Sequence, residues 1–384
     1  MIIFGIETSC DETAAAIVED GVKEICSVVA SSKEFHEKTG GIVPEIAARK
    51  QVEAMVPVIS ECFEKLRLAR GFDSFCCKQQ AEKCYETIDA VAVTIGPGLI
   101  GSLVVGIEAA KALSLFLNKP LIPVNHLVGH IYGNFIDNPE AVKFPAIVLV
   151  VSGGHTDLIL MKNHGEIEYL GGTLDDAAGE AYDKVAKFLN LGYPGGPIID
   201  KLTNKMTQSK YSFTIPKIKN VAVRFIAPDI NENLDFSFSG LKTAVINLVK
   251  QKFTNAEKIP ESEKKEIAFA FQETTVNYLL KNTKIAIDKS NVKTVVFAGG
   301  VAANSRLRKK ALALTNQQTD KPTNRLTEIY FPSISLCTDN AAMVAGLAYH
   351  KILCKGLIYA SPTKPSFEHP TFLNLNAVPN LKIG

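Results

Sequence analysis

The chain has 384 residues, with 42 basic and 40 acidic side chains, 46% hydrophobic residues and no tryptophan. This length exceeds what one compact core usually holds and suits two lobes of roughly 150–200 residues each. The charged fraction of 21% is that of a globular protein, which excludes a disordered or fibrous chain. A formal charge of +2 argues against binding nucleic acid by overall electrostatics, although a basic patch on one face is compatible with it.

The first residues and the cysteines bear on where the protein works. Residues 1–7 include no basic region or small-residue cleavage site, and apolar runs such as 144–151 are far shorter than the ~20 residues of a membrane helix. We therefore expect a cytoplasmic protein. The eight cysteines form no C-x-x-C pair, and their cluster between positions 62 and 84 fits no common zinc spacing. Reduced thiols in a helical insertion near residues 70–86 are the simplest interpretation, and a metal site is the alternative.

Two similar β-hairpins are predicted, one in each half of the chain. Residues 2–6 and 14–18 are apolar strands around the polar turn 7–13, and residues 146–151 and 158–161 flank the turn 152–157. Small polar turns allow backbone amides to hold a phosphate. The pair indicates either a duplicated architecture with one phosphate loop per lobe or a chance recurrence of a common motif.

Two strand–turn–helix patterns follow. Residues 88–94 predict a buried strand, which leads through a glycine-rich turn into a helix over 102–116. Residues 295–298 lead in the same way through the turn 299–304 into a basic helix over 305–314. Alternating strands and helices predict an α/β fold. Polar stretches at 217–233 and 317–327 are expected to be loops.

The strongest local signal for chemistry is a pair of histidines, His126 and His130. On a helix, positions i and i+4 share one face, so both imidazoles could bind one divalent cation. The alternative is that they are ordinary core or surface histidines. Zinc peptidases with this spacing need a glutamate directly after the first histidine, and Leu127 stands there instead.

Three further places offer carboxylates. Asp339 precedes an apolar helix over 341–350 and is either a third metal ligand or the N-cap of that helix. Glu7, Asp11 and Glu12 lie in the first hairpin turn, which is either solvated or suited to magnesium–phosphate or proton-transfer chemistry. Acidic residues within 175–184 share a helix face that is either functional or simply exposed to solvent.

Taken together, these segments resemble the TsaD family of tRNA N6-adenosine threonylcarbamoyltransferases, once described as O-sialoglycoprotein endopeptidases. The motifs that carry the resemblance occur in order along the chain, at residues 5–13 (GIETSCDET), 41–45 (GIVPE), 126–130 (HLVGH), 151–155 (VSGGH), 175–184, 193–197, 235–243 (DFSFSGLKT), 298–304 (AGGVAAN) and 337–340 (CTDN). The V-P-E form at 43–45 is similar to that of the bacterial branch.

The resemblance implies a two-lobed actin/hexokinase/Hsp70-like (ASKHA) α/β fold, with duplicated RNase H-like lobes and the active site in the cleft. We expect an N-terminal lobe over residues 1–124, with the insertion near 70–86, completed by the C-terminal helix and tail at 340–384. The second lobe is expected over residues 125–339 and to carry both the metal and the adenylate sites.

The resemblance also implies a reaction and its site residues. The threonylcarbamoyl group passes from threonylcarbamoyl-AMP to N6 of adenosine 37 in tRNAs that read ANN codons, forming t6A and releasing AMP. His126, His130 and Asp339 would hold one Fe(2+) or Zn(2+) ion, and Asp11, with Glu12 beside it, would take the proton of the attacking amine. The expected adenylate-binding residues are Val150, Val151, Ser152, Gly153, Gly154, Asp183, Gly196, Asp200 and Asn304.

The implied partners are tRNA, a TsaB-like paralogue and a TsaE-like ATPase, with a TsaC-type synthase supplying the adenylate. Two other functions compete with the transferase. An actin-like ATPase or scaffold paralogue would share the fold but has no need of the two histidines and Asp339. A metallopeptidase is disfavoured by Leu127.

Overall fold

The computed structural model describes residues 1–71, 85–136, 142–215, 233–253, 259–290, 292–314, 328–354 and 374–383. Most of the insertion predicted near 70–86 and of the loops predicted at 217–233 and 317–327 lies outside these residues. The chain divides into two compact units. Unit 1 comprises Met1–Ala141 and Thr338–Ile383, and unit 2 comprises Val142–Cys337.

Unit 1 is built on a five-stranded sheet in the order β3-β2-β1-β4-β5. Strands β1 (Ile2–Glu7), β2 (Glu12–Glu19) and β3 (Lys23–Ser31) are antiparallel neighbours. Strands β4 (Ala90–Gly96) and β5 (Leu121–Asn125) extend the sheet in parallel with β1. The first predicted hairpin and the strand predicted at 88–94 are therefore confirmed.

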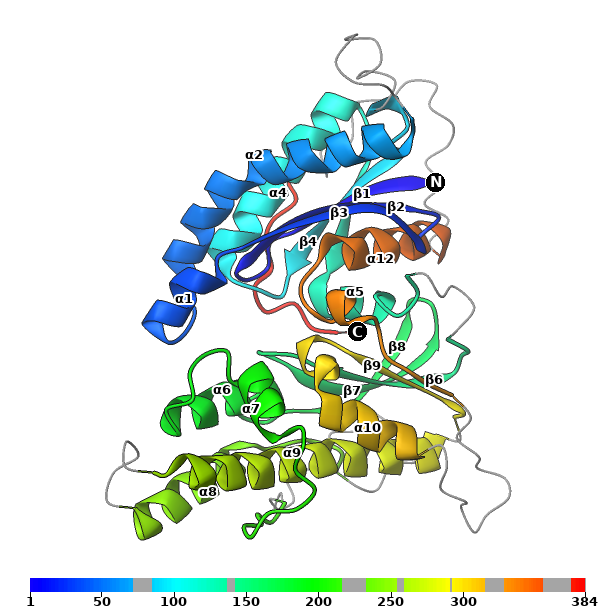
Figure 1. The fold of residues 1–384 in the computed structure, drawn as a ribbon. Helices are drawn as coiled ribbons and strands as arrows, with labels where there is room; N and C mark the ends of the chain where they lie inside the picture. Colours follow the sequence, from blue (N-terminus) through cyan, green and yellow to red (C-terminus); the bar gives the residue numbers. More distant parts are fainter. Residues whose placement is uncertain are drawn as a thin grey trace. The chain divides into compact units, whose positions relative to one another are not determined.

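Helices cover both faces of this sheet (Figure 1). On one face, Phe4 and Ile6 share a buried core with residues of α2 (Pro44–Ala69) and α4 (Ile100–Leu117). On the other face lies α12 (Ala341–Cys354), which approaches Gly5 so closely that a Cβ there would lie 2.4 Å from the Ala341 carbonyl oxygen. Two short helices, α1 (Lys33–Thr39) and α5 (His126–Tyr132), complete the unit.

Unit 2 repeats the strand arrangement, in the order β10-β9-β6-β7-β8. Strands β6 (Ala146–Val151), β7 (Thr156–Asn163) and β8 (Glu166–Gly172) are antiparallel, whereas β9 (Thr294–Ala298) and β10 (Glu328–Tyr330) are parallel additions beside β6. Both sheets thus consist of an antiparallel meander followed by two parallel strands. The two predicted hairpins are the first two strands of this repeated unit, so the duplication is real.

The helices of unit 2 run from α6 to α11, and their bounds are α6 (Ala178–Phe188), α7 (Gly195–Thr203), α8 (Ser239–Lys252), α9 (Glu261–Ser290), α10 (Ser305–Leu314) and α11 (Ile334–Cys337). A 3-10 turn, η2 (Gly300–Ala303), precedes α10. Alternate residues of β6, namely Ile147, Leu149 and Val151, point into a core that also contains Tyr182 of α6 and Phe271 of α9. The helix predicted over 305–314 has the predicted bounds.

The division between the units differs from the predicted lobes. We expected the second lobe to begin at residue 125 and to carry the metal site, but α5 belongs to unit 1. The reason is packing, since Gly129 of α5 faces Met343 of α12, where a Cβ would be in ordinary contact at 3.5 Å. The two histidines and Asp339 therefore all lie in unit 1.

One described helix, α4, is long and apolar enough to cross a membrane by length and composition alone. We did not identify this helix from the sequence as long enough for a membrane, because we considered only uninterrupted apolar runs. Its Leu103, Ile107 and Ala110 are at most 1% exposed and belong to the core of unit 1, which accounts for the apolar composition.

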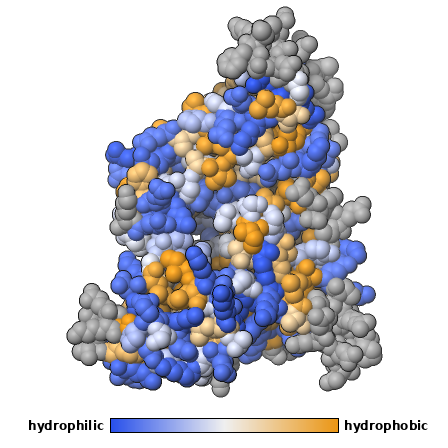
Figure 2. All heavy atoms as spheres, viewed as in Figure 1, coloured by the Kyte–Doolittle hydropathy of each residue, from blue (hydrophilic) through white to orange (hydrophobic). Residues whose placement is uncertain are grey.

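Apolar side chains are also exposed on the surface of unit 1, as Figure 2 shows. Among them are Val52 and Val56 of α2, which are 63% and 70% exposed.

Candidate metal centre and substrate site

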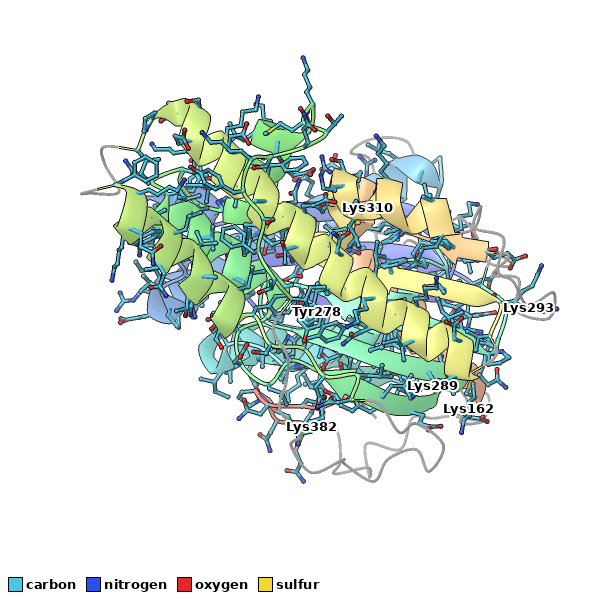
Figure 3. All side chains as sticks on the ribbon, turned by 90° about the horizontal axis from the view of Figure 1, so that it is seen from below. Lys162, Tyr278, Lys289, Lys293, Lys310 and Lys382 are labelled. Carbon is cyan, nitrogen blue, oxygen red and sulfur yellow. The ribbon has the colours of Figure 1, made fainter. Side chains whose placement is uncertain are left out.

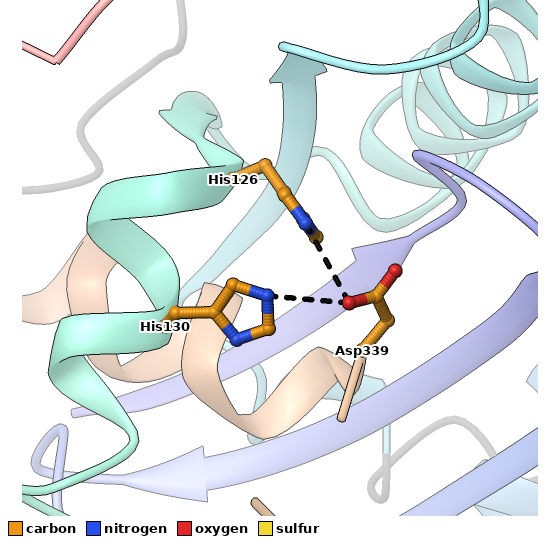
Figure 4. A group of neighbouring side chains, drawn as sticks. All are labelled: His126, His130 and Asp339. Carbon is orange, nitrogen blue, oxygen red and sulfur yellow. Dashed lines mark ion pairs between the residues drawn. The ribbon is translucent and has the colours of Figure 1, made fainter. Parts of the chain in front are cut away.

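The two candidate histidine ligands lie on α5, which begins directly after strand β5 ends. Strand β5 ends at Asn125, whose side-chain oxygen accepts hydrogen bonds from the backbone N–H groups of Leu127 and Val128 at 2.9 and 3.1 Å. This N-cap starts α5 directly at His126 and places His130 one turn later on the same face. Asp339 precedes α12 and points at both rings (Figure 4).

The three side chains lie close enough together to hold one metal ion. Asp339 Oδ1 lies 3.5 Å from His126 Nε2 and 3.2 Å from His130 Nε2, and the candidate ligand atoms are all within 4.8 Å of one another. His126 is 7% exposed and His130 is 1% exposed. Neither ring nitrogen of His130 has a well-aligned hydrogen-bond partner among the described residues. Two imidazoles and a carboxylate suit iron or zinc, so the residues present fit such an ion and would satisfy the buried nitrogen that faces Asp339.

The alternative role of Asp339 as a helix cap is taken by its neighbour. The side-chain oxygen of Asn340 accepts a hydrogen bond from the Met343 N–H at 2.9 Å, and its amide donates to the Thr338 carbonyl oxygen at 2.8 Å. Asn340 thereby caps α12, so the carboxylate of Asp339 is left to face the histidines.

Glu7, which we predicted only as one of the acids of the first turn and not as part of the metal site, contacts His126 at Nδ1. Its carboxylate is fully buried, and Oε2 lies 3.2 Å from His126 Nδ1. Ser9 N–H donates to the other carboxylate oxygen at 2.6 Å, and Ser9 Oγ lies 3.1 Å from His126 Nδ1. A carboxylate on Nδ1 keeps the proton on that nitrogen and leaves Nε2 free to bind a metal ion. The available sequence signal was an acid at the end of an entirely apolar strand.

The pKa values of Asp339 and His126 are shifted because these charged groups lie close together and are shielded from water. Burial opposes ionisation of Asp339, but the positive charge of His126 and the closeness of His130 lower its pKa to about 2. Burial likewise opposes protonation of His126, yet Glu7 and Asp339 raise its pKa to about 9. These directions describe the chain without a bound cation, in which a protonated imidazole balances the two carboxylates.

The turn with the candidate catalytic acids lies close to this centre. Burial, together with the negative charges of Asp339 and Asp11, raises the pKa of Glu12 to about 10. A hydrogen bond from Ser31 Oγ at 3.3 Å holds the Glu12 carboxyl group. Glu12 is therefore protonated near neutral pH unless a cation offsets Asp339.

In unit 2, the predicted adenylate residues of the second hairpin form an open turn. Val150 and Val151 are fully buried in β6, so they can offer a ligand only their backbone. In the turn that follows, Ser152 N–H donates to the His155 carbonyl oxygen and Ser152 Oγ accepts from the His155 N–H. A Cβ at Gly153 or Gly154 would meet no atom within 4 Å, so a ligand could approach the backbone there.

The other predicted adenylate residues lie at the first turns of α7 and α10 or contact these turns. Asp183 accepts a hydrogen bond from the Gly195 N–H at 2.7 Å, and burial raises its pKa. Gly196 is open to a ligand, because a Cβ at that position would meet no atom within 4 Å. Asp200 accepts from Ser305 N–H and Oγ at 3.0 and 2.9 Å. Asn304 caps α10 and donates to Gln272 at 2.9 Å.

The acidic cluster predicted near 175–184 is not simply a solvated face. Asp175 accepts hydrogen bonds from Ser237 Oγ, Ser239 Oγ and the Phe238 N–H. Asp176 pairs with Lys184 at 2.5 Å and with Lys242 at 2.6 Å. These contacts tie the loop before α6 to the 235–243 segment, which gives both motifs a shared structural role.

Comparison with known proteins identifies the family. The family model described as TsaD, tRNA N6-adenosine threonylcarbamoyltransferase, matches residues 23–346. Proteins of that name from Carboxydothermus hydrogenoformans and Thermosipho africanus are 45% and 46% identical to this chain. Both matches cover 100% of this chain, and they cover 98% and 100% of the two relatives.

Solved structures support the fold alone. HypF from T. kodakarensis matches with a TM-score of 0.56 and 12% identity, over 92% of this chain and 48% of its own. A full-length HypF in a phosphate- and nucleotide-bound form gives 0.54 and 14%, over 92% and 55%. These structures confirm the predicted fold class. The named relatives and the family model confirm the predicted enzyme class, so a scaffold paralogue is not favoured. With a family model over most of its length and relatives of one name over all of it, the chain belongs to the TsaD family of tRNA N6-adenosine threonylcarbamoyltransferases.

Proposed function

We propose that this chain transfers the threonylcarbamoyl group of threonylcarbamoyl-AMP to N6 of adenosine 37 in tRNAs that read ANN codons. The N6 amine attacks the carbamoyl carbon, the bond from that carbon to the phosphate oxygen breaks, and AMP leaves. The observation that carries the proposal is the His126–His130–Asp339 cluster, with both histidines buried, in a chain of this family. Neither an ATPase nor a scaffold needs such a cluster.

One Fe(2+) or Zn(2+) ion is the proposed occupant of the cluster. When bound, such an ion supplies a Lewis acid that polarises a carbonyl oxygen of the substrate. His126 and His130 would bind through Nε2 and Asp339 through its carboxylate, and Glu7 would orient His126 from behind.

The acids of the first turn are the proposed route for the proton. An exocyclic amine is a weak acid, so its proton leaves as the new C–N bond forms. Asp11 is the proposed acceptor, and Glu12 stabilises the turn beside it. Burial and the negative charge of Asp339 together raise the pKa of Glu12, which couples this turn to the proposed metal ligands.

The adenylate is proposed to bind to unit 2 where glycines leave the backbone accessible to a ligand. Gly153, Gly154 and Gly196 leave room for phosphate or ribose against the backbone. Asp183 and Asp200 offer carboxylate oxygens to ribose hydroxyl groups. Asn304 completes the set at the N-terminus of α10.

The proposed partners are tRNA, a TsaB-like paralogue and a TsaE-like ATPase, with a TsaC-type synthase supplying the adenylate in the cytoplasm. The exposed Val52 and Val56 on α2 support a protein partner on unit 1, because an apolar surface of this kind gains from being covered.

The test is mass spectrometry of tRNA nucleosides from cells depleted of this protein. Threonylcarbamoyladenosine should vanish on depletion and return with the wild-type chain, but not with His126→Ala. His164→Ala, which changes a histidine of unit 2 outside the cluster, is the matched control and should restore the nucleoside. A normal level of the nucleoside after depletion would contradict the proposal.

A further inference from the structure

A basic surface extends along the second half of α9 and across α10 in unit 2. It comprises Lys281, Lys284, Lys289, Arg306, Lys309 and Lys310, and we refer to it as the α9–α10 surface. In Figure 3, α9 crosses the front of unit 2 with Lys289 near its C-terminal end, and Lys310 lies beside it on α10. The acids along the same stretch are Glu273 and Asp288, so basic side chains outnumber them.

Specific contacts join the two helices into one surface. Glu273 of α9 pairs with Arg306 at 2.8 Å and also with Lys310, whose amino group donates to Asn277 at 2.7 Å. Asn277, Lys281 and Lys284 follow one another at helical spacing along the exposed side of α9. Lys310 of α10 therefore lies next to the turn of α9 that precedes Lys281.

The charges on this surface are only partly used within the protein. Glu273 occupies Arg306 and Lys310, whereas Lys281, Lys284 and Lys309 are exposed and form no ion pair with another described residue. The first half of α9 is different, since Lys210 pairs with Glu263 and Lys264 pairs with Glu261 there. The exposed lysines of α9 thus lie in its second half, since Lys264 is buried and Lys265 is half-buried in the first.

We infer that the α9–α10 surface binds the sugar–phosphate backbone of the tRNA substrate. This inference rests on the proposed function, which makes tRNA the acceptor. Exposed lysines without ion-pair partners in the protein are opposite in charge to phosphate groups and can pair with them. Such phosphate contacts position a nucleic acid without reading its sequence. The surface also begins at the proposed adenylate site, because Asn304 caps the helix that carries Arg306 and Lys309.

The test compares tRNA affinity of the full-length chain with that of Lys281→Ala/Lys284→Ala, by fluorescence anisotropy on an unmodified ANN-decoding tRNA over a range of salt concentrations. Binding should weaken roughly tenfold at about 0.1 M salt. The slope of the logarithm of the binding constant against the logarithm of the salt concentration should become less negative by about two, one for each lost phosphate contact. Lys281→Arg/Lys284→Arg should keep the wild-type affinity. The matched control is Lys23→Ala/Lys65→Ala, which removes two exposed lysines of unit 1 and should change neither quantity.

Equal affinities and salt slopes for the wild type and Lys281→Ala/Lys284→Ala would overturn the inference, as would an equal loss in the control. Both lysines are exposed, so a thermal melt identical to that of the wild type is expected and shows that the variant folds. Binding is measured without threonylcarbamoyl-AMP. A chain that binds tRNA through this surface but transfers nothing would therefore overturn the proposed reaction alone, and a chain that transfers with an affinity indifferent to these lysines would overturn the surface alone.

Discussion

Whether His126 can bind a metal ion depends on which of its ring nitrogens carries a proton. Glu7 and Ser9 both contact Nδ1, so Nε2 is the nitrogen that faces His130 and Asp339. Glu7 is itself held by the Ser9 N–H and by the Thr94 hydroxyl group, which leaves it little freedom to turn away. The ligand geometry is thus fixed by residues outside the three proposed ligands.

We expect Glu7→Gln to weaken metal binding about 10- to 100-fold, because the amide can donate to Nδ1 and so favour a proton on Nε2. The affinity for Zn(2+) is measured by competition with a chromogenic chelator. Glu45→Gln, which changes an exposed glutamate on α2, is the control and should bind as the wild type does. An unchanged affinity in Glu7→Gln would show that the ring is oriented by other contacts.

The raised pKa of Glu12 predicts that the free energy of unfolding of the metal-free chain depends on pH. Its folded pKa of about 10 is far above the ordinary value of 4.5, so the unfolded chain releases this proton at lower pH than the folded chain. The stability of the folded state therefore falls as pH rises from about 5 toward 10. We expect Glu12→Gln to melt at a higher temperature than the wild type at pH 8 and at nearly the same temperature at pH 4.5.

Thermal unfolding monitored by circular dichroism at several pH values measures this difference. Glu53→Gln, an exposed glutamate of α2, is the control and should follow the wild type at every pH. Parallel pH curves for Glu12→Gln and the wild type would mean that Glu12 ionises normally in the folded chain.

Among the elements, the approach of α12 to β1 matters most for the site, because α12 follows directly after Asp339. The approach is close since Gly5 has no side chain, and the nearest backbone atom to a Cβ there would be the Ala341 carbonyl oxygen at 2.4 Å. Real Cβ atoms do not come so close to backbone, so a larger residue at position 5 must displace the start of α12. The position of Asp339 therefore depends on a glycine in a distant strand.

We expect Gly5→Ala to lower the free energy of unfolding by roughly 1–3 kcal/mol through overpacking and to weaken metal binding at the same time. Urea unfolding measures the first effect and zinc competition the second. Gly300→Ala is the control, since a Cβ at that position would meet no atom within 4 Å. Wild-type stability and metal affinity in Gly5→Ala would show that α12 can move without cost.

Local sequence patterns predicted much of the element structure. The two hairpins, the strand at 295–298 and the helix over 305–314 could be predicted because hydrophobic periodicity and turn residues act within a few positions. The spacing of His126 and His130 was informative for the same reason. The contact of Glu7 with His126 could not be predicted in this way, because 119 positions separate the two residues.

For the molecule as a whole, the duplication and the return of the C-terminal helix to the first unit could be predicted, but the place of α5 could not. The two sheets share one strand order, which the paired hairpins already indicated. The assignment of α5 to unit 1 depends on its packing against α12, some 200 residues later, and no local pattern reports such a contact. The proposed metal ligands consequently belong to the unit formed by both ends of the chain.

The proposed reaction requires that His126, His130 and Asp339 together hold one ion. This requirement is tested by the rate of t6A formation by the chelator-stripped chain, with its partners and the adenylate supplied, as Fe(2+) or Zn(2+) is added back in known increments. The rate should rise in proportion to bound metal and level off at about one ion per chain. His130→Ala and Asp339→Asn should regain little activity, whereas His164→Ala should recover fully. Full activity of the stripped wild-type chain, or equal recovery in all variants, would contradict a metal-dependent transfer.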